Sequence, residues 1–405
     1  MLQSSRASDQ DMLAQYMRAA HIQPGGKIVN LDDQSMWFTA RELQSLQLKA
    51  QDVVMVEGGA GYGRSAYLAA DLDGWGFQNS ILRIRRDPER AVGAFVHYAL
   101  SAALDDGQIA AACNQATFAH FTAEKVAAFE IPVPALASQQ AVVDFLDRET
   151  TEIDAFIADQ EELIALLTER RAAAITHAVT KGLDPSAPMN ESGLAWLGDL
   201  PAQWRLMPFG FAVLYREGPG IGAVDFRDEG VPLIRIAGVR GRFATLAGCN
   251  FLDPVAVASR WQRFQIERGD LLVSASASMG TVSEAGSDVV GAIPYTGIIR
   301  MKPRGGINRD YLRLFLESSA FMTQIDLLKT GSTIQHYGPE HLRQMYIPVP
   351  RERDQKIIAE HLTHQIAELD ATIADAREAI ALSKERRAAL ISAAVTGKID
   401  VRGLA

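Results

Sequence analysis

Ile131-Pro132-Val133-Pro134 opens a stretch of sequence that occurs twice in this chain. A long run of mixed polar and apolar residues follows it and ends at Ala178-Val179-Thr180. The same pattern returns from Ile347-Pro348-Val349-Pro350 to Ala394-Val395-Thr396, at a constant offset of 216 residues. About half of the paired positions are identical. A period of this length is too long for a solenoid repeat and indicates a duplicated module.

Each copy of the repeat predicts a long helix. Between Ser138 and about Thr180 the first copy contains neither proline nor glycine, and its apolar residues follow a heptad spacing. Several consecutive heptads separated by charged residues are typical of a coiled coil. An amphipathic helix packed on one domain is the alternative, but both copies keep the same apolar seam, so each could be the partner of the other. The predicted seam residues are Leu146, Ile153, Ile157, Ile164, Leu167, Leu362, Ile366, Leu369, Ile373 and Ile380.

The segments outside the two helices read as globular domains that share one plan. The apolar run of Gly269 to Val273 matches that of Gln51 to Met55, and Leu233 to Ala237 matches Tyr16 to Ala20. Short apolar runs of this kind, with β-branched residues as in Val53 and Val54, favour strands. We therefore predict an α+β fold with an internal repeat. Its four parts are a first globular domain (1–137), a first helix and linker (138–187), a second globular domain (188–350) and a second helix with its tail (351–405).

Composition places the chain in the ordinary globular class. It has 405 residues, two cysteines and a net charge of −9. Two cysteines suggest reduced thiols rather than a disulfide framework, and no apolar run resembles a signal peptide or a bilayer span, so we expect a cytoplasmic protein. An acidic chain argues against nucleic-acid binding, but residues 131–189 alone account for −6 of the total. A local basic face elsewhere remains compatible with these numbers.

A glycine-rich loop follows the apolar run that ends at Val56. Gly58 to Ser65 nearly spells a phosphate-binding P-loop, but Arg64 stands where that motif needs lysine, and no long helix is predicted after it. The matched loop, Ser274 to Thr281, has no such pattern. A P-loop enzyme is therefore nearly excluded. A tight loop of small residues is the simplest reading, and a loop that lets backbone amides approach DNA is the functional one.

No other motif points to catalysis or to a metal. His120 and His336 occupy matched positions, but no His, Cys, Asp and Glu cluster has metal-ligand spacing. Arg235, Arg240 and Arg242 lie on a predicted hairpin, where they could contact phosphates or base edges. The alternative for any one of them is solvated surface charge. The full set of candidate DNA-binding residues is Arg18, Lys27, Gly59, Gly61, Tyr62, Arg64, Thr117, His120, Arg235, Arg240, Arg242, Ser276, Ser278, Lys329, Ser332, Thr333, Gln335, His336 and Tyr337.

The order of these motifs resembles a known family. Gly182-Leu183-Asp184-Pro185, the Trp196 to Trp204 segment, the Ile-Pro-Val-Pro pairs, the Glu-Arg-Arg helices and Gly331-Ser332-Thr333 are similar to the specificity subunit of type I restriction-modification systems. This resemblance covers nearly the whole chain. It implies two target-recognition domains, each reading one half of a split double-stranded DNA site, and two helices that pair as an antiparallel coiled coil with pseudo-twofold symmetry.

The resemblance also implies partners and a division of labour. The specificity subunit itself is expected to be non-catalytic and to bind no cofactor. Two methyltransferase subunits using S-adenosylmethionine would dock on it, and endonuclease/translocase subunits using ATP and Mg²⁺ would join them. The alternative is a coiled-coil protein scaffold that reads no DNA, which the acidic balance favours. One departure stands out, because the first globular domain has no counterpart of the Trp196 to Trp204 segment.

Overall fold

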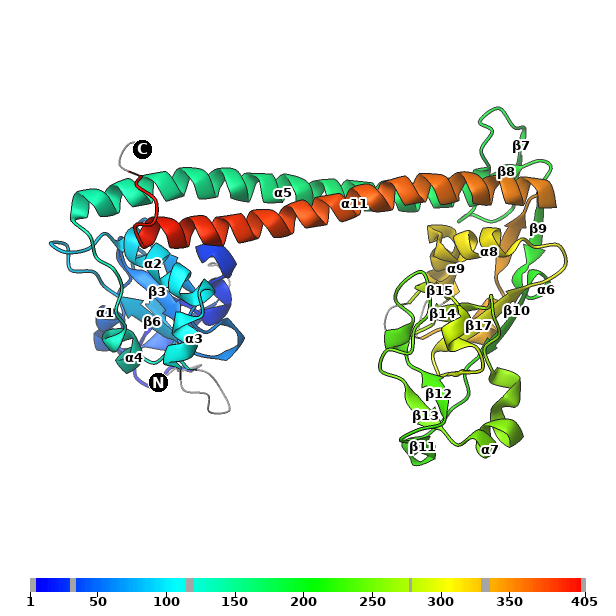
Figure 1. Ribbon diagram of the computed structural model, residues 1–405, viewed down its shortest axis with the longest axis horizontal. Helices are drawn as coiled ribbons and strands as arrows, with labels where there is room; N and C mark the ends of the chain where they lie inside the picture. The colour runs from blue at the N-terminus through cyan, green and yellow to red at the C-terminus, as the bar shows by residue number, and fades with distance from the viewer. Residues whose placement is uncertain (1–4, 30–33, 114–119, 277–278, 329–335, 402–405) are drawn as a thin grey trace. The chain divides into compact units, whose positions relative to one another are not determined.

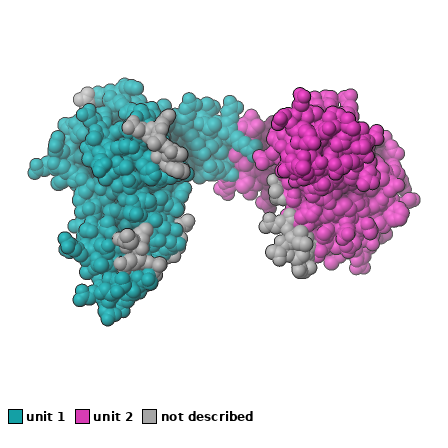
Figure 2. Space-filling model, turned by 90° about the horizontal axis from the view of Figure 1, so that it is seen from below, with its two compact units in different colours: residues 1–161, 376–405 teal, residues 162–375 magenta. Residues whose placement is uncertain are grey.

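The computed structural model divides into two compact units, shown in different colours in Figure 2. Unit 1 comprises residues 1–161 and 376–405, and unit 2 comprises residues 162–375. The structure describes residues 5–29, 34–113, 120–276, 279–328 and 336–401. Each unit therefore contains one globular domain together with parts of both long helices (Figure 1).

The two long helices are continuous. The helix predicted from Ser138 to about Thr180 is confirmed as α5 (Leu136–Lys181), and its repeat forms α11 (Glu352–Val395). In unit 1 the first part of α5 packs against the last part of α11, since Val143 and Leu146 share a buried cluster with Ile391. In unit 2 the last part of α5 packs against the first part of α11. The helices therefore run antiparallel, as an α+β fold with a coiled coil requires.

The side chains of the predicted seam face the helix partner in both units. Leu146 and Leu362 are fully buried, and the others are buried or half-buried at spacings of three and four residues. A pair of opposite charges crosses the seam in each unit at matched positions. Arg387 Nε lies 3.0 Å from Asp154 Oδ1 in unit 1, and Arg171 Nε lies 3.2 Å from Asp370 Oδ1 in unit 2. The repeat thus preserves the polar contacts of the helix pair as well as its apolar core.

The domain of unit 1 is built on two small sheets, with strand orders β2-β1-β5 and β4-β3-β6. β1 lies between an antiparallel partner and a parallel one, and β3 lies between two antiparallel partners. Buried apolar side chains of β3 contact those of α2 beneath the second sheet. Its elements are β1 (Met12–Met17), β2 (Ser35–Phe38), α1 (Ala40–Ser45), β3 (Val53–Val56), β4 (Ser65–Tyr67), β5 (Gly76–Phe77), β6 (Ile81–Ile84), α2 (Gly93–Asp105), α3 (Gln108–Ala112) and α4 (Ala123–Ala128).

The domain of unit 2 repeats this plan and adds to it. β12 and β14 take the places of β1 and β3, with the same parallel and antiparallel neighbours. The added elements are α6, the pair β7-β8, the strand β9 beside β18 and the edge strands β10 and β11. The strands and helices are β7 (Met189–Glu191), β8 (Asp199–Pro201), β9 (Arg205–Pro208), α6 (Phe209–Ala212), β10 (Val213–Glu217), β11 (Phe226–Arg227), β12 (Val231–Ile234), β13 (Asn250–Leu252), α7 (Pro254–Ala256), β14 (Leu271–Ser274), β15 (Val282–Glu284), β16 (Ile293–Pro294), β17 (Ile298–Pro303), α8 (Arg309–Glu317), α9 (Ser319–Leu328), α10 (Pro339–Leu342) and β18 (Tyr346–Val349).

Two local predictions differ from the structure. The strand expected over Tyr16 to Ala20 runs instead from Met12 to Met17, and residues 19–21 form a 3₁₀ turn. The alanine-rich composition of residues 91–112 predicts one helix, but the structure has two, α2 and α3, because Gly107 adopts φ +75° between them. A left-handed residue cannot continue a helix, and glycine adopts this conformation at little cost.

A buried glutamine joins each domain to its helix by the same three hydrogen bonds. Gln139 accepts a bond of 2.8 Å from the Val92 N–H and donates to the carbonyls of Arg90 and Pro134 at 2.9 and 2.7 Å. Its repeat partner Gln355 accepts from the Asn308 N–H at 2.7 Å and donates to the carbonyls of Gly306 and Pro350. All six partners obey the 216-residue offset. We call this arrangement the glutamine joint.

One buried histidine makes the stability of unit 1 dependent on pH. Burial, together with the charge of Arg387, lowers the pKa of His97 to about 4, and the ring hydrogen-bonds the Ser65 hydroxyl. Unfolding restores a pKa of about 6.5, so the unfolded chain binds more protons between these values. The contribution of neutral His97 is complete above about pH 6.5 and is lost as the pH falls towards 4, at a cost of about 3 kcal/mol.

Denaturant unfolding from pH 7 to 4 should show this loss, and His97→Gln should reduce the dependence of the unfolding free energy on pH. The exposed His177→Gln is the matched control; an unchanged slope in His97→Gln would contradict the assignment.

Candidate nucleic-acid interface

The same contact brings a histidine to the end of a central strand in both units. After β3, the backbone of Gly58 bridges that of His120, and Phe121 N–H donates to the Glu57 carbonyl at 2.8 Å. After β14, the backbone of Ser276 bridges that of His336, and Tyr337 N–H donates to the Ala275 carbonyl at 3.1 Å. Each domain therefore places a histidine beside the loop that follows its buried strand.

In unit 1 this site is shaped by the glycine-rich loop. Gly58 is needed for close approach, because a Cβ there would lie 2.4 Å from the His120 ring. Gly59 to Gly61 form a 3₁₀ turn, and β4 begins directly after Arg64. A P-loop requires a helix at that point, so the structure agrees with excluding it. On this loop Tyr62 and Arg64 are half-buried, and His120, whose ring lies against Gly58, is exposed.

In unit 2 the histidine site is polar and is bounded by residues from distant strands. His336 Nε2 lies 3.2 Å from Glu217 Oε1, at the end of β10, and the same oxygen accepts from the Gly297 N–H at 3.2 Å. Gly297 has φ +85°, and a Cβ there would lie 2.4 Å from Ser276 Oγ. Only glycine fits this position without displacing Ser276. The site therefore combines a carboxylate, an imidazole and a hydroxyl near the ends of β10 and β14.

Arg235 belongs to the same face of unit 2. It follows β12, and its guanidinium carbon lies 4.0 Å from the centre of the Tyr295 ring while Nη1 donates to Asn250 Oδ1 at 3.4 Å. Stacking on an aromatic ring holds the planar guanidinium in one orientation. Tyr295 in turn is two residues from Gly297. A half-buried, oriented arginine of this kind suits bidentate recognition of guanine.

The other candidate residues are spread over several environments. Arg240 is exposed, and Arg242 pairs with Glu284 at 3.6 Å, on the connection between β12 and β13 rather than on strands. Lys27 lies 4.0 Å from Asp154 of α5, and Arg18 is placed against His21. Predictions for Thr117, Ser278, Lys329, Ser332, Thr333 and Gln335 lie outside the described residues.

The prediction that Tyr337 contacts DNA is wrong for its side chain. Tyr337 is fully buried in the core of unit 2, where its hydroxyl donates to the Ser274 carbonyl at 3.2 Å. Burial raises the pKa of this hydroxyl. Phe121 occupies the matched place in unit 1 and is fully buried as well. The aromatic residue after each histidine therefore anchors the site from below.

Glu217, Tyr295 and Asn250 also border the site and were missed from the sequence. Nothing in the sequence near His336 or Arg235 points to them, because they lie 15 residues or more along the chain from the residues they contact. Within the described residues, no group of three or more His, Cys, Asp or Glu side chains could hold a metal ion. A helix long and apolar enough to cross a membrane is likewise not found in the described part of the chain.

Comparison with known proteins agrees with this architecture. Residues 258–379 match the family model of the type I restriction modification DNA specificity domain. The chain is 26% identical over 214 residues to the StySPI specificity subunit of Salmonella potsdam and 27% identical over 216 residues to the EcoKI specificity subunit of Escherichia coli K12. Each alignment covers 50% of this chain and 44% of the relative. The chain thus spans less than half the length of these relatives.

Solved structures share the fold over almost the full length. One chain, from work on complex assembly and conformational transition of the type I R-M system, superposes with a TM-score of 0.69 at 18% identity, covering 96% of this chain and 93% of the other. The HsdS subunit from Thermoanaerobacter tengcongensis gives 0.51 at 18% identity, with 96% and 92% covered. The sequence matches thus agree with the predicted resemblance: this chain is similar to type I restriction-modification specificity subunits, and residues 258–379 match the model of their DNA specificity domain.

Proposed function

We propose that this chain selects the DNA target of a type I restriction-modification complex by reading a split site. The observation that carries the proposal is the duplicated histidine site, which lies on two domains of unlike sequence that are fixed to paired helices by the same glutamine joint. A protein that reads two different half-sites needs two domains attached in the same way, with loops that differ in sequence. Residues 1–137 and 188–350 would be the two target-recognition domains.

Each domain would read bases with the loops around its histidine. The major groove distinguishes all four base pairs, and arginine reads guanine there with two hydrogen bonds. Arg235 is the leading candidate for such a contact in unit 2, whereas exposed Arg240 is better suited to a phosphate. Negative charge on 131–189 does not oppose this role, since those residues lie mainly on α5.

The paired helices would carry the partner subunits. In unit 1 a groove of about 510 Å³ runs between α5 and α11, and its rim exposes 44% of Phe156 and 57% of Leu382. Exposed apolar side chains in a groove are typical of protein docking. Two methyltransferase subunits, with S-adenosylmethionine, and endonuclease/translocase subunits, with ATP and Mg²⁺, are the partners we propose. The chain itself would bind none of these cofactors and perform no chemistry.

Methylome sequencing of cells that express the chain with its methyltransferase partner tests the function. A new methylated motif in two parts, with a fixed gap, is the expected result. A stable complex of the two proteins without new methylation would instead favour the second candidate, a coiled-coil scaffold without DNA readout. The acidic α5 and the groove beside Phe156 are the observations that favour that alternative.

Arg235→Ala should relax recognition in one half-site only. Loss of a bidentate contact to a base costs about 1–3 kcal/mol, so methylation should become degenerate at one position of the half-site read by unit 2. The half-site read by unit 1 should stay unchanged. Arg205→Ala, an exposed arginine on β9, is the matched control and should preserve the whole motif. Equal relaxation of both half-sites would exclude this role for Arg235.

A further inference from the structure

The tetrapeptide Ile-Pro-Val-Pro is covered in one unit and open in the other. In unit 2, Ile347, Pro348 and Pro350 are buried. In unit 1 the identical residues Ile131 to Pro134 are half-buried or exposed, and Val133 exposes 53% of its surface. Identical sequence at matched positions of a repeat should bury to the same extent. The difference must come from what lies on top of it.

In unit 2 the tetrapeptide is covered by β9, and Trp204, directly before that strand, anchors it. β9 pairs antiparallel with β18, which places Met207 opposite Ile347 and Arg205 opposite Val349. Trp204, directly before β9, packs against the core of unit 2, and its Cζ2 lies 3.2 Å from where a Cβ of Gly182 would be. Lys181 Nζ donates to the Leu197 carbonyl at 2.9 Å and so holds the segment from the other side.

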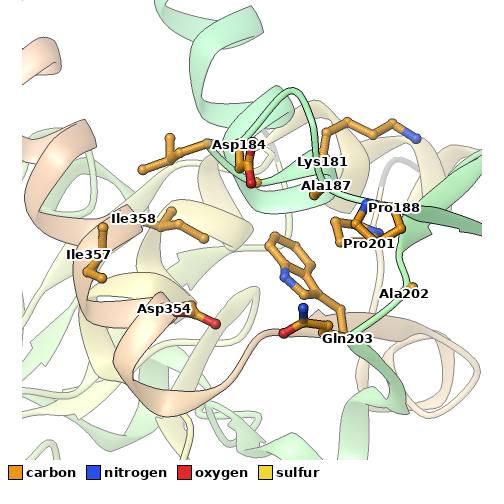
Figure 3. Close-up of a pocket in the computed structure, with 13 residues that line it drawn as sticks. Lys181, Asp184, Ala187, Pro188, Pro201, Ala202, Gln203, Asp354, Ile357 and Ile358 are labelled. Atoms are coloured by element: carbon orange, nitrogen blue, oxygen red, sulfur yellow. The ribbon is translucent and has the colours of Figure 1, made fainter.

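A cavity of about 240 Å³ marks the edge of this contact in unit 2. Figure 3 shows it between the turn at Asp184, the segment from Pro201 to Gln203 and the first turns of α11 with Asp354 and Ile358. The strand and its anchor therefore seat in a groove made by the end of α5 and the start of α11, both of which belong to the repeat.

In the described part of unit 1 the same groove carries no strand. Its cavity of about 410 Å³ is lined by Pro132 to Pro134, and by Ser138 and Val142, which match Asp354 and Ile358. Residues 394–401 form the opposite wall, where Ile399 and Asp400 match Leu183 and Asp184. Within the part of the chain that the structure describes, nothing hydrogen-bonds to the backbone amides of Ile131 and Val133.

We propose that this groove of unit 1 accepts an extended segment of another polypeptide, with the chemistry of residues 199–208. The segment would pair as a strand with residues 130–133 and insert an aromatic side chain between α5 and the end of α11. Strand addition supplies backbone hydrogen bonds, and the aromatic anchor supplies specificity. Gly397 stands at the position that matches Lys181, so the proposed segment would be held by strand pairing and by its aromatic side chain, without the lysine contact of unit 2.

A second copy of this chain is the less suitable donor. Its own residues 205–208 are already paired with its β18, and its Trp204 already packs in the core of its unit 2. Donation would uncover Ile347, which is fully buried. A partner whose segment is free carries no such cost. The inference goes beyond DNA reading and does not depend on it.

The test uses the full chain and a synthetic peptide of residues 194–208, labelled for fluorescence anisotropy. We expect saturable binding with one site per chain. Trp204→Ala in the peptide should weaken binding by roughly tenfold or more, since a buried aromatic side chain contributes well over 1 kcal/mol. Val133→Arg in the chain should weaken peptide binding similarly, because Val133 lines the groove. The substitution should leave the core intact, since this side chain is exposed.

Val224→Arg is the matched control, since Val224 is 85% exposed and lies in the other unit. Circular dichroism of both variants shows that the fold is kept. Absence of saturable binding, or binding that Val133→Arg leaves unchanged, would overturn the proposal. Concentration-dependent dimers of the chain that the peptide dissociates would also overturn it, because a second copy would then be the donor.

Discussion

A heptad inserted into each long helix should lengthen the gap between the two half-sites of the proposed split DNA target and leave both half-site sequences unchanged. Suitable positions follow Glu161 in α5 and Asp375 in α11, at the boundaries of the two units. One heptad preserves the apolar seam. At about 1.5 Å per residue it adds about 10 Å, and because B-DNA rises about 3.4 Å per base pair the gap should grow by about three base pairs.

Methylome sequencing reads out the gap and both half-sites in one experiment. Affinity should fall as well, because about three base pairs also turn one half-site around the DNA axis. Insertion into α5 alone is the control, since it lengthens one helix without its partner and should lower the melting temperature of the chain. New half-site sequences, or an unaltered gap, would show that the helices do not set the spacing.

Gln355→Ala should destabilise unit 2 by about 3 kcal/mol, and Gln139→Ala should do the same in unit 1. The alanine removes one acceptor and two donors at once. It leaves one N–H and two carbonyls, which are mostly part-buried, without their partner, and this costs more than the hydrogen bonds themselves contribute. Urea unfolding with hydrogen-exchange readout for each unit measures both effects. The loss should be confined to the unit that contains the substituted glutamine.

The next residue along each helix provides the control. Gln140 and Lys356 are exposed and also match by the repeat offset, so Gln140→Ala and Lys356→Ala should change stability by no more than about 0.5 kcal/mol. Gln355→Glu tests the donors separately, because a carboxylate still accepts from the Asn308 N–H but cannot donate to the carbonyls. If it is as stable as the parent, the two carbonyl contacts contribute nothing.

The regular parts of the fold could be predicted because their signals are local and long. α5 extends one or two residues beyond the range read from heptads and from the lack of proline and glycine. The buried strand β3 coincides with a short β-branched run, and β14 coincides with the apolar run that matches it in the repeat. The beginning of β1 was missed, since Met12 and Leu13 lie on an exposed edge and carry no alternation. Added strands such as β10 were not predicted either, because only their partners in the sheet stabilise them.

The candidate site was predictable only where the repeat points to it. Matched positions brought out His120 and His336, and a run of glycines brought out the loop beside His120. Glu217 and Tyr295 come from strands distant in sequence, so no spacing rule reaches them. Tyr337 shows the opposite error, since a polar aromatic residue next to a loop suggested a contact surface but the side chain turns into the core.

The glutamine joint has a consequence for how the protein can change. Every group that Gln139 and Gln355 grasp outside their helices is a main-chain N–H or carbonyl, and at matched positions the side chains differ, as with Val92 and Asn308 or Arg90 and Gly306. The attachment therefore does not depend on which side chains the bonded residues carry. A domain can diverge in sequence, or be exchanged for another of the same backbone path, while its helix continues to hold it in the same way. Under the proposed function, the DNA sequence that a domain reads could therefore change without any change in the helices that attach it.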